Sequence, residues 1–513
     1  MTTTTALTIP GLVVNAARLW PDDLALLDED FSVSFAGLEE LMMEAAAAFV
    51  AVGLQPGERV GLWAPNSDNW VIAALGIQAA QGVLVPLNTR FKGGEAEFAL
   101  SHANAAMAVA AENFLDTRYA DVIAGLDLPG LRRTIALGGK EWDAFLASAS
   151  ADDRREAEKR LAALAPSDVC DIMFTSGTTG DPKGVVSSHE QVAGTARLWS
   201  KATGLTYGDR FKILWPFFHS AGYKAGWVSC LAVGAAALPE AVLDAPRLLE
   251  KVQREDVTFL PGPPTLFQTL LSMPDRPEGA LDSVRVSVTG ASSVAPSLIE
   301  AMGDELGIPT VLNGYGLTEC CGTATMSITG DLPEILTTTV GKVIDCVEVE
   351  IMDDDGNILP RGEPGEVMIR GMNVMLGYLD DEEATREAIT PEGWLHSGDI
   401  GTLDEEGYLR ITDRKKEMFI TGGFNVYPAE VEKQLMAHPA VFQVAVIGIP
   451  DERMGEVCCA HIVPKQGRSI TEAELIEWSR ERLANYKVPR KVVVAKSLPT
   501  NATGKVQKFK LPT

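Results

Sequence analysis

The chain has 513 residues, of which 46% are hydrophobic and 22% are charged. The length predicts more than one domain, and the composition is typical of an ordered protein rather than a disordered chain. With 70 acidic and 44 basic residues, the formal net charge is −26. The average field of such a chain repels polyanions, so we expect neither a nucleic-acid binder nor a protein held on an anionic membrane.

Seven cysteines are spread along the chain, and no two of them form a C-x-x-C pair. This spacing predicts neither a zinc site nor a disulfide framework, and it favours a cytoplasmic location. The pair His189-Glu190 begins like a zinc-protease motif, but Ala193 stands where the second histidine is required. The N-terminus lacks the basic segment of a signal peptide. The apolar run from Ala225 to Pro239 is shorter than the ~20 residues that span a bilayer, so we expect no integral membrane segment.

The first part of the chain alternates helix and strand signals. Residues 38–52, which end before Gly53, and residues 69–81 predict helices, while residues 59–63 and 83–87 predict strands. The alternation continues, with further predicted strands at 171–174, 257–260, 284–288 and 311–313. Strands separated by helices predict parallel sheets that are covered by helices.

The pattern changes near Val340. Residues 347–352 and 365–370 alternate apolar and polar side chains around a turn, as antiparallel hairpins do, and this predicts a small β unit at about 340–410. Helix and strand signals then mix between Lys416 and the C-terminus. We therefore predict an α/β protein. Its N-terminal domain, residues 1–414, would hold two helix-covered sheets and a small β-barrel, and residues 415–513 would form a small, mobile α+β domain.

Residues 171–185 carry the strongest motif, DIMFTSGTTGDPKGV. A buried strand leads into a loop of hydroxyl and glycine residues and then to a lysine. Glycines let backbone N–H groups turn toward an anion, and the hydroxyls and the ammonium add donors and charge. This chemistry suits a pyrophosphate, although the spacing is not that of a Walker A loop; the alternative is an ordinary Gly/Thr turn. The candidate phosphate-binding residues are Thr175, Ser176, Gly177, Thr178, Thr179, Gly180 and Lys183.

This loop resembles the signature loop of the adenylate-forming superfamily, which includes acyl-CoA synthetases, luciferases and the adenylation domains of peptide synthetases. Further segments similar to the family's motifs follow in order over essentially the whole chain. One of them is NGYGLTE at 313–319. The resemblance implies that Tyr315 packs on adenine, that Thr318 touches a phosphate and that Glu319 holds Mg²⁺. An aromatic face suits a base, and a carboxylate suits a hard cation.

The resemblance implies further nucleotide contacts. The segment WLHSGD at 394–399 is similar to the family's Thr-Gly-Asp motif, with Ser397 in place of the usual threonine. Asp399 would accept hydrogen bonds from both ribose hydroxyls, and Arg414 would also reach the ribose. The short turn at 290–293 would lie along adenine and the acyl chain. The nucleotide-binding residues implied beyond the phosphate loop are Gly290, Ala291, Ser292, Asn313, Gly314, Tyr315, Gly316, Asp399, Ile411 and Arg414.

Three segments near the C-terminus resemble the family's moving parts. In ITDRKKE at 411–417, Lys416 stands at the position of the hinge between the two domains. In TGGFNVYPAE at 421–430, Gly422, Gly423 and Phe424 would line the pantetheine tunnel for coenzyme A. In PTNATGK at 499–505, Lys505 matches the catalytic lysine. A basic run or a lysine near a C-terminus is most often just exposed, so these assignments rest on the resemblance.

The segment PFFHSAGYKAG at 216–226 resembles the entrance to the family's acyl pocket, with His219 as its aromatic gate. Lys224 interrupts an almost wholly apolar stretch, and an unpaired buried ammonium is costly. Two explanations stay open. Lys224 reaches the surface or pairs with a carboxylate, or it donates to a polar group, such as a ketone, on the acid. The implied pocket residues are Phe218, Tyr223, Lys224, Gly226, Pro263 and Gly322.

The motifs together predict an ATP-dependent acid–CoA ligase with ATP, Mg²⁺ and coenzyme A as its cofactor and cosubstrates. The acid would attack the α-phosphorus of ATP, and the coenzyme A thiol would then take the acyl group from the acyl-adenylate. The predicted catalytic residues are Lys505, Thr318, Glu319 and His219. We expect the partners of this protein to be small molecules, namely the carboxylic acid, ATP and coenzyme A, and a homodimer stays open.

Three competing functions can be weighed. An enzyme that loads a carrier protein is expected to continue into a carrier domain, whereas this chain ends eight residues after Lys505. A luciferase-type oxidase would share the motifs. A non-catalytic relative would be expected to lack Glu319 or Lys505.

The identity of the acid is the open point. The segments PFFHSAGYKAG, PGPPT at 261–265 and GGFNVYP at 422–428 resemble actinobacterial acyl-CoA ligases, most of all those that activate the propanoate-bearing indanedione left from steroid rings C and D. Medium-chain fatty acids and arylpropenoic or benzoic acids stay open as alternatives.

Overall fold

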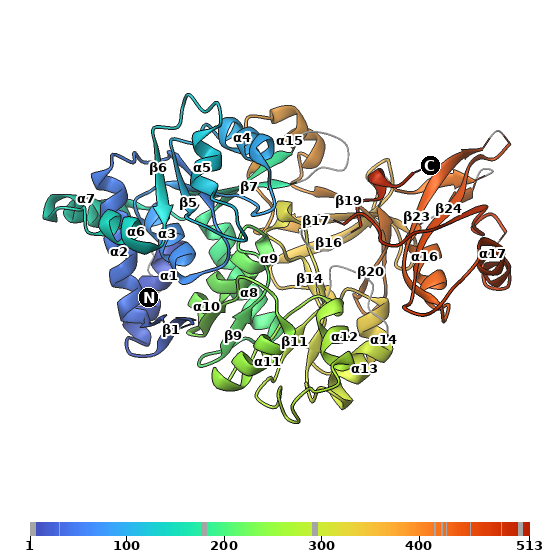
Figure 1. Cartoon of the computed structure of the whole chain (residues 1–513). Coiled ribbons are helices and arrows are strands. Elements are labelled where there is room, and N and C mark those ends of the chain that lie inside the picture. Colours follow the sequence, from blue (N-terminus) through green and yellow to red (C-terminus); the bar gives the residue numbers. More distant parts are fainter. Residues whose placement is uncertain are drawn as a thin grey trace. The chain divides into compact units, whose positions relative to one another are not determined.

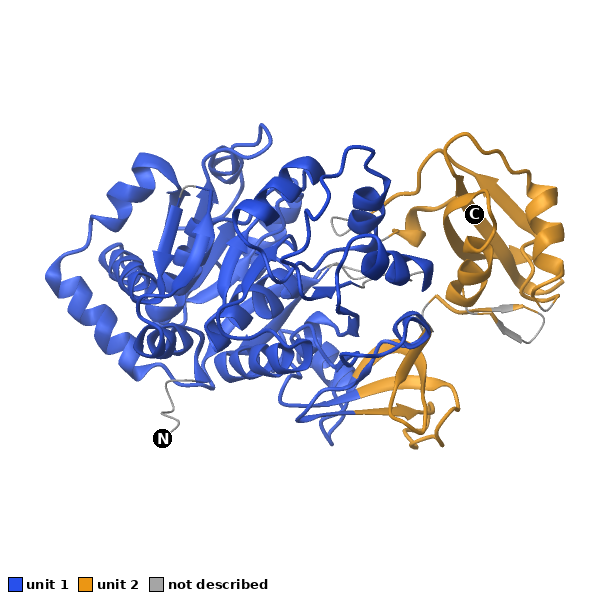
Figure 2. Cartoon of the chain, turned by 90° about the horizontal axis from the view of Figure 1, so that it is seen from below, with its two compact units in different colours: residues 1–290, 294–348, 369–395 blue, residues 291–293, 349–368, 396–513 orange. Residues whose placement is uncertain are grey.

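The structure is a computed structural model that describes residues 7–29, 31–175, 182–289, 296–414, 417–421, 424–426, 428–451, 453–483, 485–500 and 506–512. The chain divides into two compact units (Figure 2). Unit 1 comprises residues 1–290, 294–348 and 369–395, and unit 2 comprises residues 291–293, 349–368 and 396–513. The predicted domain boundary between residues 414 and 415 stays a prediction.

The larger sheet of unit 1 has seven strands. Five neighbouring strands are parallel to one another. Strand β8 pairs with the first of them in the antiparallel sense, and β18 in turn pairs antiparallel with β8. In spatial order the strands are β18 (Gly377–Tyr378), β8 (Lys183–Ser188), β7 (Val169–Thr175), β4 (Val83–Pro86), β3 (Arg59–Trp63), β5 (Met107–Ala111) and β6 (Arg133–Leu137). Strands β4 and β5 are buried along their whole length, as parallel strands covered on both faces are. The expected α/β class with parallel sheets is confirmed.

A second sheet of unit 1 has the order β2-β1-β10-β9. Single bridges at Phe259 connect it to a two-stranded parallel pair. The predicted strand at 257–260 is therefore wrong in extent, because within this range only Phe259 forms β-bridges. Pro261, which follows, has no N–H with which to continue a ladder. The strands are β1 (Leu24–Asp28), β2 (Phe31–Ser34), β9 (Arg210–Ile213), β10 (Ala236–Pro239), β11 (Ser287–Val288) and β12 (Val311–Leu312).

Helices of unit 1 gather beside these sheets, and α2 packs on α1, α3, α6 and α7 (Figure 1). Side-chain caps set the starts of the two predicted helices: Ser34 accepts a hydrogen bond from Gly37 N, and Ser67 accepts one from Trp70 N. The helices are α1 (Ile9–Leu19), α2 (Phe35–Ala51), α3 (Asp68–Ala79), α4 (Gly93–His102), α5 (Tyr119–Ala124), α6 (Gly139–Leu146), α7 (Ala151–Ala163), α8 (His189–Thr203), α9 (Ser220–Gly222), α10 (Val228–Val233), α11 (Ala245–Arg254), α12 (Pro264–Ser272), α13 (Pro296–Asp304), α14 (Pro333–Thr338) and α15 (Glu382–Ala388).

Two smaller sheets follow in the chain, and the second of them contains the β segments that were predicted after residue 340. The three-stranded sheet is β13 (Gly314–Tyr315), β14 (Thr325–Met326) and β15 (Lys342–Val343). The four-stranded sheet has the order β16 (Val347–Met352), β17 (Gly365–Gly371), β19 (Leu395–Leu403) and β20 (Leu409–Arg414). The predicted strand at 347–352 matches β16, and the predicted strand at 365–370 ends one residue before β17 does.

The C-terminal part of unit 2 is an α+β fold, as predicted. Its core includes Val431 and Leu435 of one helix, Leu475 of the other, and Val446 and Ile462 of the sheet. The elements are β21 (Phe419–Thr421), β22 (Phe424–Val426), α16 (Pro428–Met436), β23 (Val441–Asp451), β24 (Gly455–Pro464), α17 (Glu472–Arg480) and β25 (Lys491–Val494).

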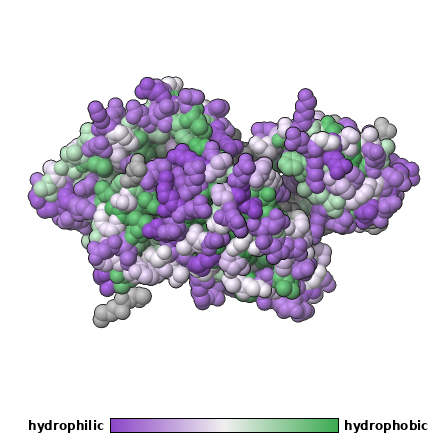
Figure 3. Space-filling model, turned by 60° about the horizontal axis from the view of Figure 1, so that its bottom comes forward, coloured by the Kyte–Doolittle hydropathy of each residue, from purple (hydrophilic) through white to green (hydrophobic). Residues whose placement is uncertain are grey.

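Hydrophilic side chains predominate on the face shown in Figure 3, with smaller hydrophobic areas between them. This surface is in keeping with the 22% of charged residues in the sequence. In the part of the chain that the structure describes, no helix is both long enough and apolar enough to cross a membrane.

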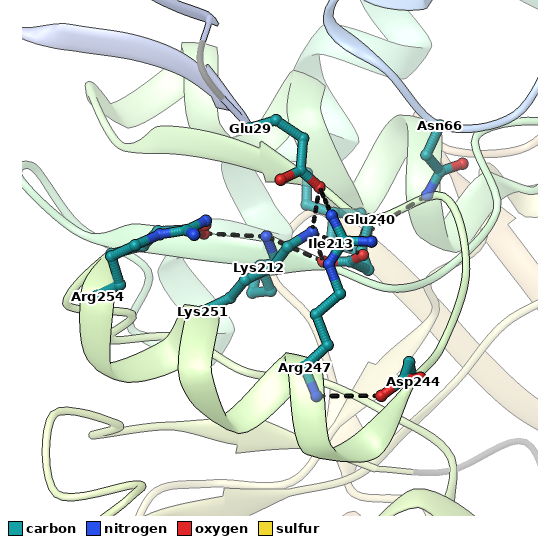
Figure 4. Close-up of polar contacts among 10 residues, drawn as sticks. Glu29, Asn66, Lys212, Ile213, Glu240, Asp244, Arg247, Lys251 and Arg254 are labelled. Carbon is teal, nitrogen blue, oxygen red and sulfur yellow. Dashed lines mark hydrogen bonds and ion pairs between the residues drawn. The ribbon is translucent and has the colours of Figure 1, made fainter.

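A buried chain of alternating charges joins β9, the end of β10 and α11 (Figure 4). The Lys212 ammonium lies 2.9 Å from Glu255 and 3.1 Å from Glu240, and the Lys251 ammonium lies 2.8 Å from Glu240 and 2.7 Å from Glu29. The side chains of Lys212, Glu240 and Glu255 are at most 8% exposed. Removing one of these charges is costly, because its partners are then left buried and unpaired.

We expect Lys212→Met to lower the free energy of unfolding of unit 1 by about 3–5 kcal/mol, because it leaves the Glu255 and Glu240 carboxylates buried without this partner. Denaturant unfolding followed by tryptophan fluorescence measures the loss. The matched control is Arg247→Met, since Arg247 pairs with Glu29 but its side chain is 60% exposed; we expect it to cost about 0–1 kcal/mol. Equal, small losses in both variants would contradict the buried network as a source of stability.

Candidate active site

The predicted phosphate loop connects two paired strands of unit 1. Strand β7 ends at Thr175 and β8 begins at Lys183, and these two residues are paired across the antiparallel ladder. Residues Ser176–Gly180 lie outside the described residues, but both ends of their segment are held by this pairing. Lys183 is exposed, and its ammonium lies 4.8 Å from the centre of the Tyr378 ring. The hairpin therefore presents the predicted phosphate-binding lysine to solvent.

The predicted adenine and metal segment forms a closed turn. Asn313 is buried, and its amide donates to the carbonyls of Leu336 and Thr339. Gly314 and Tyr315 form β13, and Thr318 and Glu319 lie in a short 3-10 helix. A Cβ on Gly316 would lie only 2.4 Å from the backbone of Gly322. The two arms of the turn thus touch, and this close contact requires glycine at 316.

Glu319 has a partner that the sequence did not reveal. The Tyr378 hydroxyl donates a hydrogen bond to Glu319 Oε1 at 3.1 Å, and Met375 N donates to the Glu319 carbonyl at 2.8 Å. Burial raises the pKa of the Tyr378 hydroxyl, and the Glu319 carboxylate raises it further, so the hydroxyl keeps its proton. The only local signal was an aromatic residue after Gly377, and no spacing rule connects it to a glutamate 59 residues away.

The donor set at Glu319 fits Mg²⁺. Mg²⁺ is usually bound by one or two carboxylates together with substrate phosphates and water, rather than by a full protein cage. Tyr378 occupies one oxygen of the half-buried Glu319 carboxylate, and further lone pairs of that carboxylate are open to a cation. In keeping with this mode, the described residues contain no cluster of three or more His, Cys, Asp or Glu side chains that could hold a metal alone.

The predicted acyl segment is an irregular helix. Residues 220–222 form α9, and residues 223–227 form a π-helix, η2, in which Gly226 departs from helical geometry with φ −88° and ψ −110°. Single-turn π segments are rare and often occur at functional sites. Tyr223 is fully buried, and its hydroxyl accepts a hydrogen bond from Gln78 Nε2 at 2.7 Å. His219 caps the segment, with its Nδ1 accepting from Ala221 N.

Lys224 pairs with a carboxylate, which is one of the two explanations considered for it. Its ammonium lies 3.1 Å from Asp171 Oδ1, and both side chains are completely buried. It also donates to Ser187 Oγ at 2.8 Å and lies 3.9 Å from Cys321 Sγ. Burial alone would lower the pKa of Lys224, but Asp171 raises it above its ordinary value, so the lysine stays charged. One carboxylate, one hydroxyl and one thiol of the protein therefore lie around this ammonium.

The remaining predicted pocket residues lie around the same segment in unit 1. Phe218 and Pro263 are half-buried, and Pro263 precedes α12. Gly322 has φ +88°, and a Cβ there would lie 2.8 Å from Ser220 Oγ. A side chain at 322 would thus be strained and would also push against the acyl segment. The assignment of these residues to an acyl pocket stays a prediction.

His189, which opens the false zinc-protease pattern, is a structural residue. It is buried at the start of α8, and its Nδ1 accepts a hydrogen bond from Ile9 N at 3.3 Å. Burial lowers the pKa of His189 to about 3, so the ring is neutral and can accept.

In unit 2, the predicted ribose carboxylate lies in strand β19. Asp399 is buried, and its backbone N–H donates to Ser397 Oγ at 3.0 Å. The turn before it is held by Glu366, which accepts from Gly398 N at 3.1 Å and lies 3.2 Å from His396 Nδ1. Sequence reasoning missed Glu366, because only strand pairing brings it to this turn. In the ladder of β19 and β20, Asp399 pairs with Arg414, and Gly401 pairs with Ile411.

Several predicted residues lie outside the described part of the chain, while their neighbours do not. Thr500 and Val506, which flank the segment of Lys505, form a bridge. The Lys508 ammonium lies 2.8 Å from both Glu417 and Glu432. Phe424 begins β22. The predicted site residues outside the described ranges are Ser176, Gly177, Thr178, Thr179, Gly180, Gly290, Ala291, Ser292, Lys416, Gly422, Gly423 and Lys505.

Comparison with known proteins points to one family. The model of the AMP-binding enzyme family matches residues 13–379, and that of the AMP-binding enzyme C-terminal domain matches residues 430–505. A 3-[(3aS,4S,7aS)-7a-methyl-1,5-dioxo-octahydro-1H-inden-4-yl]propanoyl:CoA ligase from Rhodococcus jostii is 46% identical over 512 residues, covering 98% of this chain and 97% of the relative. The ligase of the same name from Mycobacterium tuberculosis is 45% identical, covering 98% of each chain.

Solved structures agree over nearly the full length. An anthranilate CoA ligase in complex with anthranoyl-AMP superposes with a TM-score of 0.88 at 27% identity, covering 98% of this chain and 96% of that one. ATP-bound MatB from Rhodopseudomonas palustris superposes with a TM-score of 0.87 at 29% identity, covering 98% and 97%.

We expect Lys224→Met to lower the free energy of unfolding of unit 1 by about 3–5 kcal/mol, because Asp171 is then left as an unpaired buried charge. The double variant Lys224→Met, Asp171→Asn should recover much of this loss, since it removes both charges. Denaturant unfolding of the two variants tests the coupling. A Lys224→Met protein as stable as the parent would contradict the buried pair as a source of stability.

Proposed function

This chain belongs to the AMP-binding enzyme family, and we propose that it activates a propanoic acid carried on an oxygenated bicyclic ring system. The proposal rests on one observation: two ligases whose names specify a dioxo-octahydroindenyl propanoyl group are 46% and 45% identical to it over nearly the full length of each chain. The acyl-segment motifs favour the same class. Medium-chain fatty acids and arylpropenoic or benzoic acids are the alternatives.

The chain is an AMP-forming acid–CoA ligase that uses ATP, Mg²⁺ and coenzyme A. In the first step a carboxylate oxygen attacks the α-phosphorus of ATP, and the bond to the β-phosphate oxygen breaks, so an acyl-adenylate and pyrophosphate form. In the second step the coenzyme A thiol loses its proton and attacks the acyl carbonyl, and AMP leaves with the bonding electron pair. A thioester is the product.

The site residues are assigned to these steps as follows. Negative charge on the phosphates must be offset by groups that are fixed before the reaction begins. Lys183, Lys505 and the Thr318 hydroxyl are the donors available for this task, and Glu319 would hold Mg²⁺, which supplies positive charge beside the phosphates. Asp399 would orient the ribose. The second step would use Gly422 and Gly423, which let the pantetheine approach the backbone closely.

The acyl segment limits how the acid can be recognised. Because Lys224 already pairs with Asp171 inside the protein, we assign recognition of ring ketones to other donors. Gly322, a predicted pocket residue, lies close to Ser220 of the acyl segment.

An acid panel tests the substrate class. We expect kcat/KM for the dioxo-octahydroindenyl propanoate to exceed that for octanoate and for a cinnamate by about 10² or more, because a pocket that binds both ketones and ring surface discriminates against acids that lack them. AMP formation with coenzyme A present is the measurement, and the same acid without either ketone is the matched control. A preference for octanoate would overturn the proposed substrate class but not the ligase chemistry.

Lys505→Ala should lose about 10²–10³ in acyl-adenylate formation, the scale for removing one preorganised donor from a transition state. Conversion of supplied acyl-adenylate and coenzyme A to thioester should stay near the parent rate, because this step does not expel pyrophosphate. Pyrophosphate release and thioester formation are measured separately. An equal loss in both steps would contradict the assignment of Lys505 to the first.

Gly423→Leu should have the opposite profile. A leucine side chain would obstruct a narrow pantetheine path, so thioester formation should fall by an order of magnitude or more, whereas pyrophosphate release in the first step should persist. A collapse of both steps in Gly423→Leu would show that the glycine supports the fold.

The cytoplasmic location and the homodimer also stay predictions. Light scattering on the purified chain tests whether it forms a homodimer.

A further inference from the structure

Tyr378 contacts two charged groups of opposite sign at the active site. Its ring face lies 4.8 Å from the Lys183 ammonium, and its hydroxyl donates to Glu319 Oε1 at 3.1 Å. The ring attracts the cation through its negative face, and a hydrogen bond to a charged acceptor is stronger than one to a neutral acceptor. One side chain thus reaches both the phosphate loop and the predicted metal carboxylate.

The backbone of this tyrosine is fixed on several sides. In the ladder of β18 and β8, Tyr378 pairs with Val185, two residues from Lys183. Tyr378 N donates to Thr385 Oγ1 at 2.9 Å, and Leu379 N donates to the Gly184 carbonyl at 2.7 Å. The ring therefore stands on a regular ladder rather than on a loose loop, as a positioning group requires.

We propose that Tyr378 is a positioning residue for adenylate formation, which orients the Glu319 carboxylate toward Mg²⁺ with its hydroxyl and holds the Lys183 ammonium with its ring. It also keeps the lysine and the glutamate from pairing directly, which would withdraw both from ATP. The proposal rests on the ligase activity and on the predicted roles of Glu319 and Lys183. It assigns Tyr378 no contact with the reacting atoms.

Two variants separate the two contacts. Tyr378→Phe removes the hydroxyl and keeps the ring, whereas Tyr378→Leu removes both. The primary readout is ATP binding by calorimetry in the absence of any acid, with and without Mg²⁺. For Tyr378→Phe we expect the Mg²⁺ concentration needed for tight ATP binding to rise about tenfold, the scale of one hydrogen bond to a charged group. Its affinity for metal-free ATP should not change.

Tyr378→Leu should weaken ATP binding in both conditions, because Lys183 is then no longer held away from Glu319. The matched control is Tyr207→Phe: the Tyr207 hydroxyl also donates to a carboxylate, Asp23, at 2.9 Å, but this residue is 52% exposed and lies away from the predicted site residues. We expect Tyr207→Phe to bind ATP like the parent in both conditions. Thioester formation from supplied acyl-adenylate should be unchanged in both Tyr378 variants.

A Tyr378→Phe protein with the parent's Mg²⁺ dependence would overturn the proposal. So would an equal loss in the thioester step, since that pattern marks a residue needed only for the fold. Glu319→Gln is measured in parallel. If this variant keeps the parent's Mg²⁺ dependence, then the predicted role of Glu319 as a metal ligand is wrong. Because ATP binding is measured without an acid, the outcome does not depend on the proposed substrate class.

Discussion

One buried ammonium, that of Lys224, joins the separate segments of the active site in unit 1. Its partners Asp171 and Ser187 lie on β7 and β8, the two strands that flank the phosphate loop, and Cys321 lies two residues after Glu319. Lys224 itself stands in the acyl segment. A charge buried this deeply is tolerated only while its partners stay in place. Strands β7 and β8, the turn at residues 316–322 and the acyl segment therefore meet at this one charge.

Close backbone contacts add a second constraint to the same region. The turn that carries Glu319 closes because Gly316 lets its backbone touch that of Gly322. Cys321, between them in the chain, has a left-handed φ of +54°, which is unusual for a residue with a side chain. Its contact with the Lys224 ammonium supplies an interaction that favours this conformation. Backbone geometry and the buried ion pair thus act on the same turn, which carries Glu319, the predicted metal ligand.

The sequence was sufficient for what depends on near neighbours. Strand β3 and the capped helices α2 and α3 follow from local patterns, and the loop between β7 and β8 was identified from its own composition. It was insufficient where distant segments meet. Asp171 could not be named as the partner of Lys224, nor Tyr378 as the partner of Glu319, because only the packing of distant segments brings these residues together. The charged network around Lys212 was missed for the same reason: its members look like ordinary surface residues until two strands and a helix bury them.

The two lysines of the site differ in a way that suits the chemistry. Lys224 is buried and pairs with Asp171, so its charge serves the fold. Lys183 is exposed, and its one described contact is with the face of the Tyr378 ring. An exposed cation–π contact contributes only about 0.5–1 kcal/mol, whereas a charge-assisted hydrogen bond to a phosphate in a desolvated site is worth more. If Lys183 binds a phosphate of ATP as predicted, it gives up only this weak contact, whereas Lys224 would leave Asp171 as an unpaired buried charge. Burial thus distinguishes the lysine that supports the fold from the lysine that stays accessible to solvent.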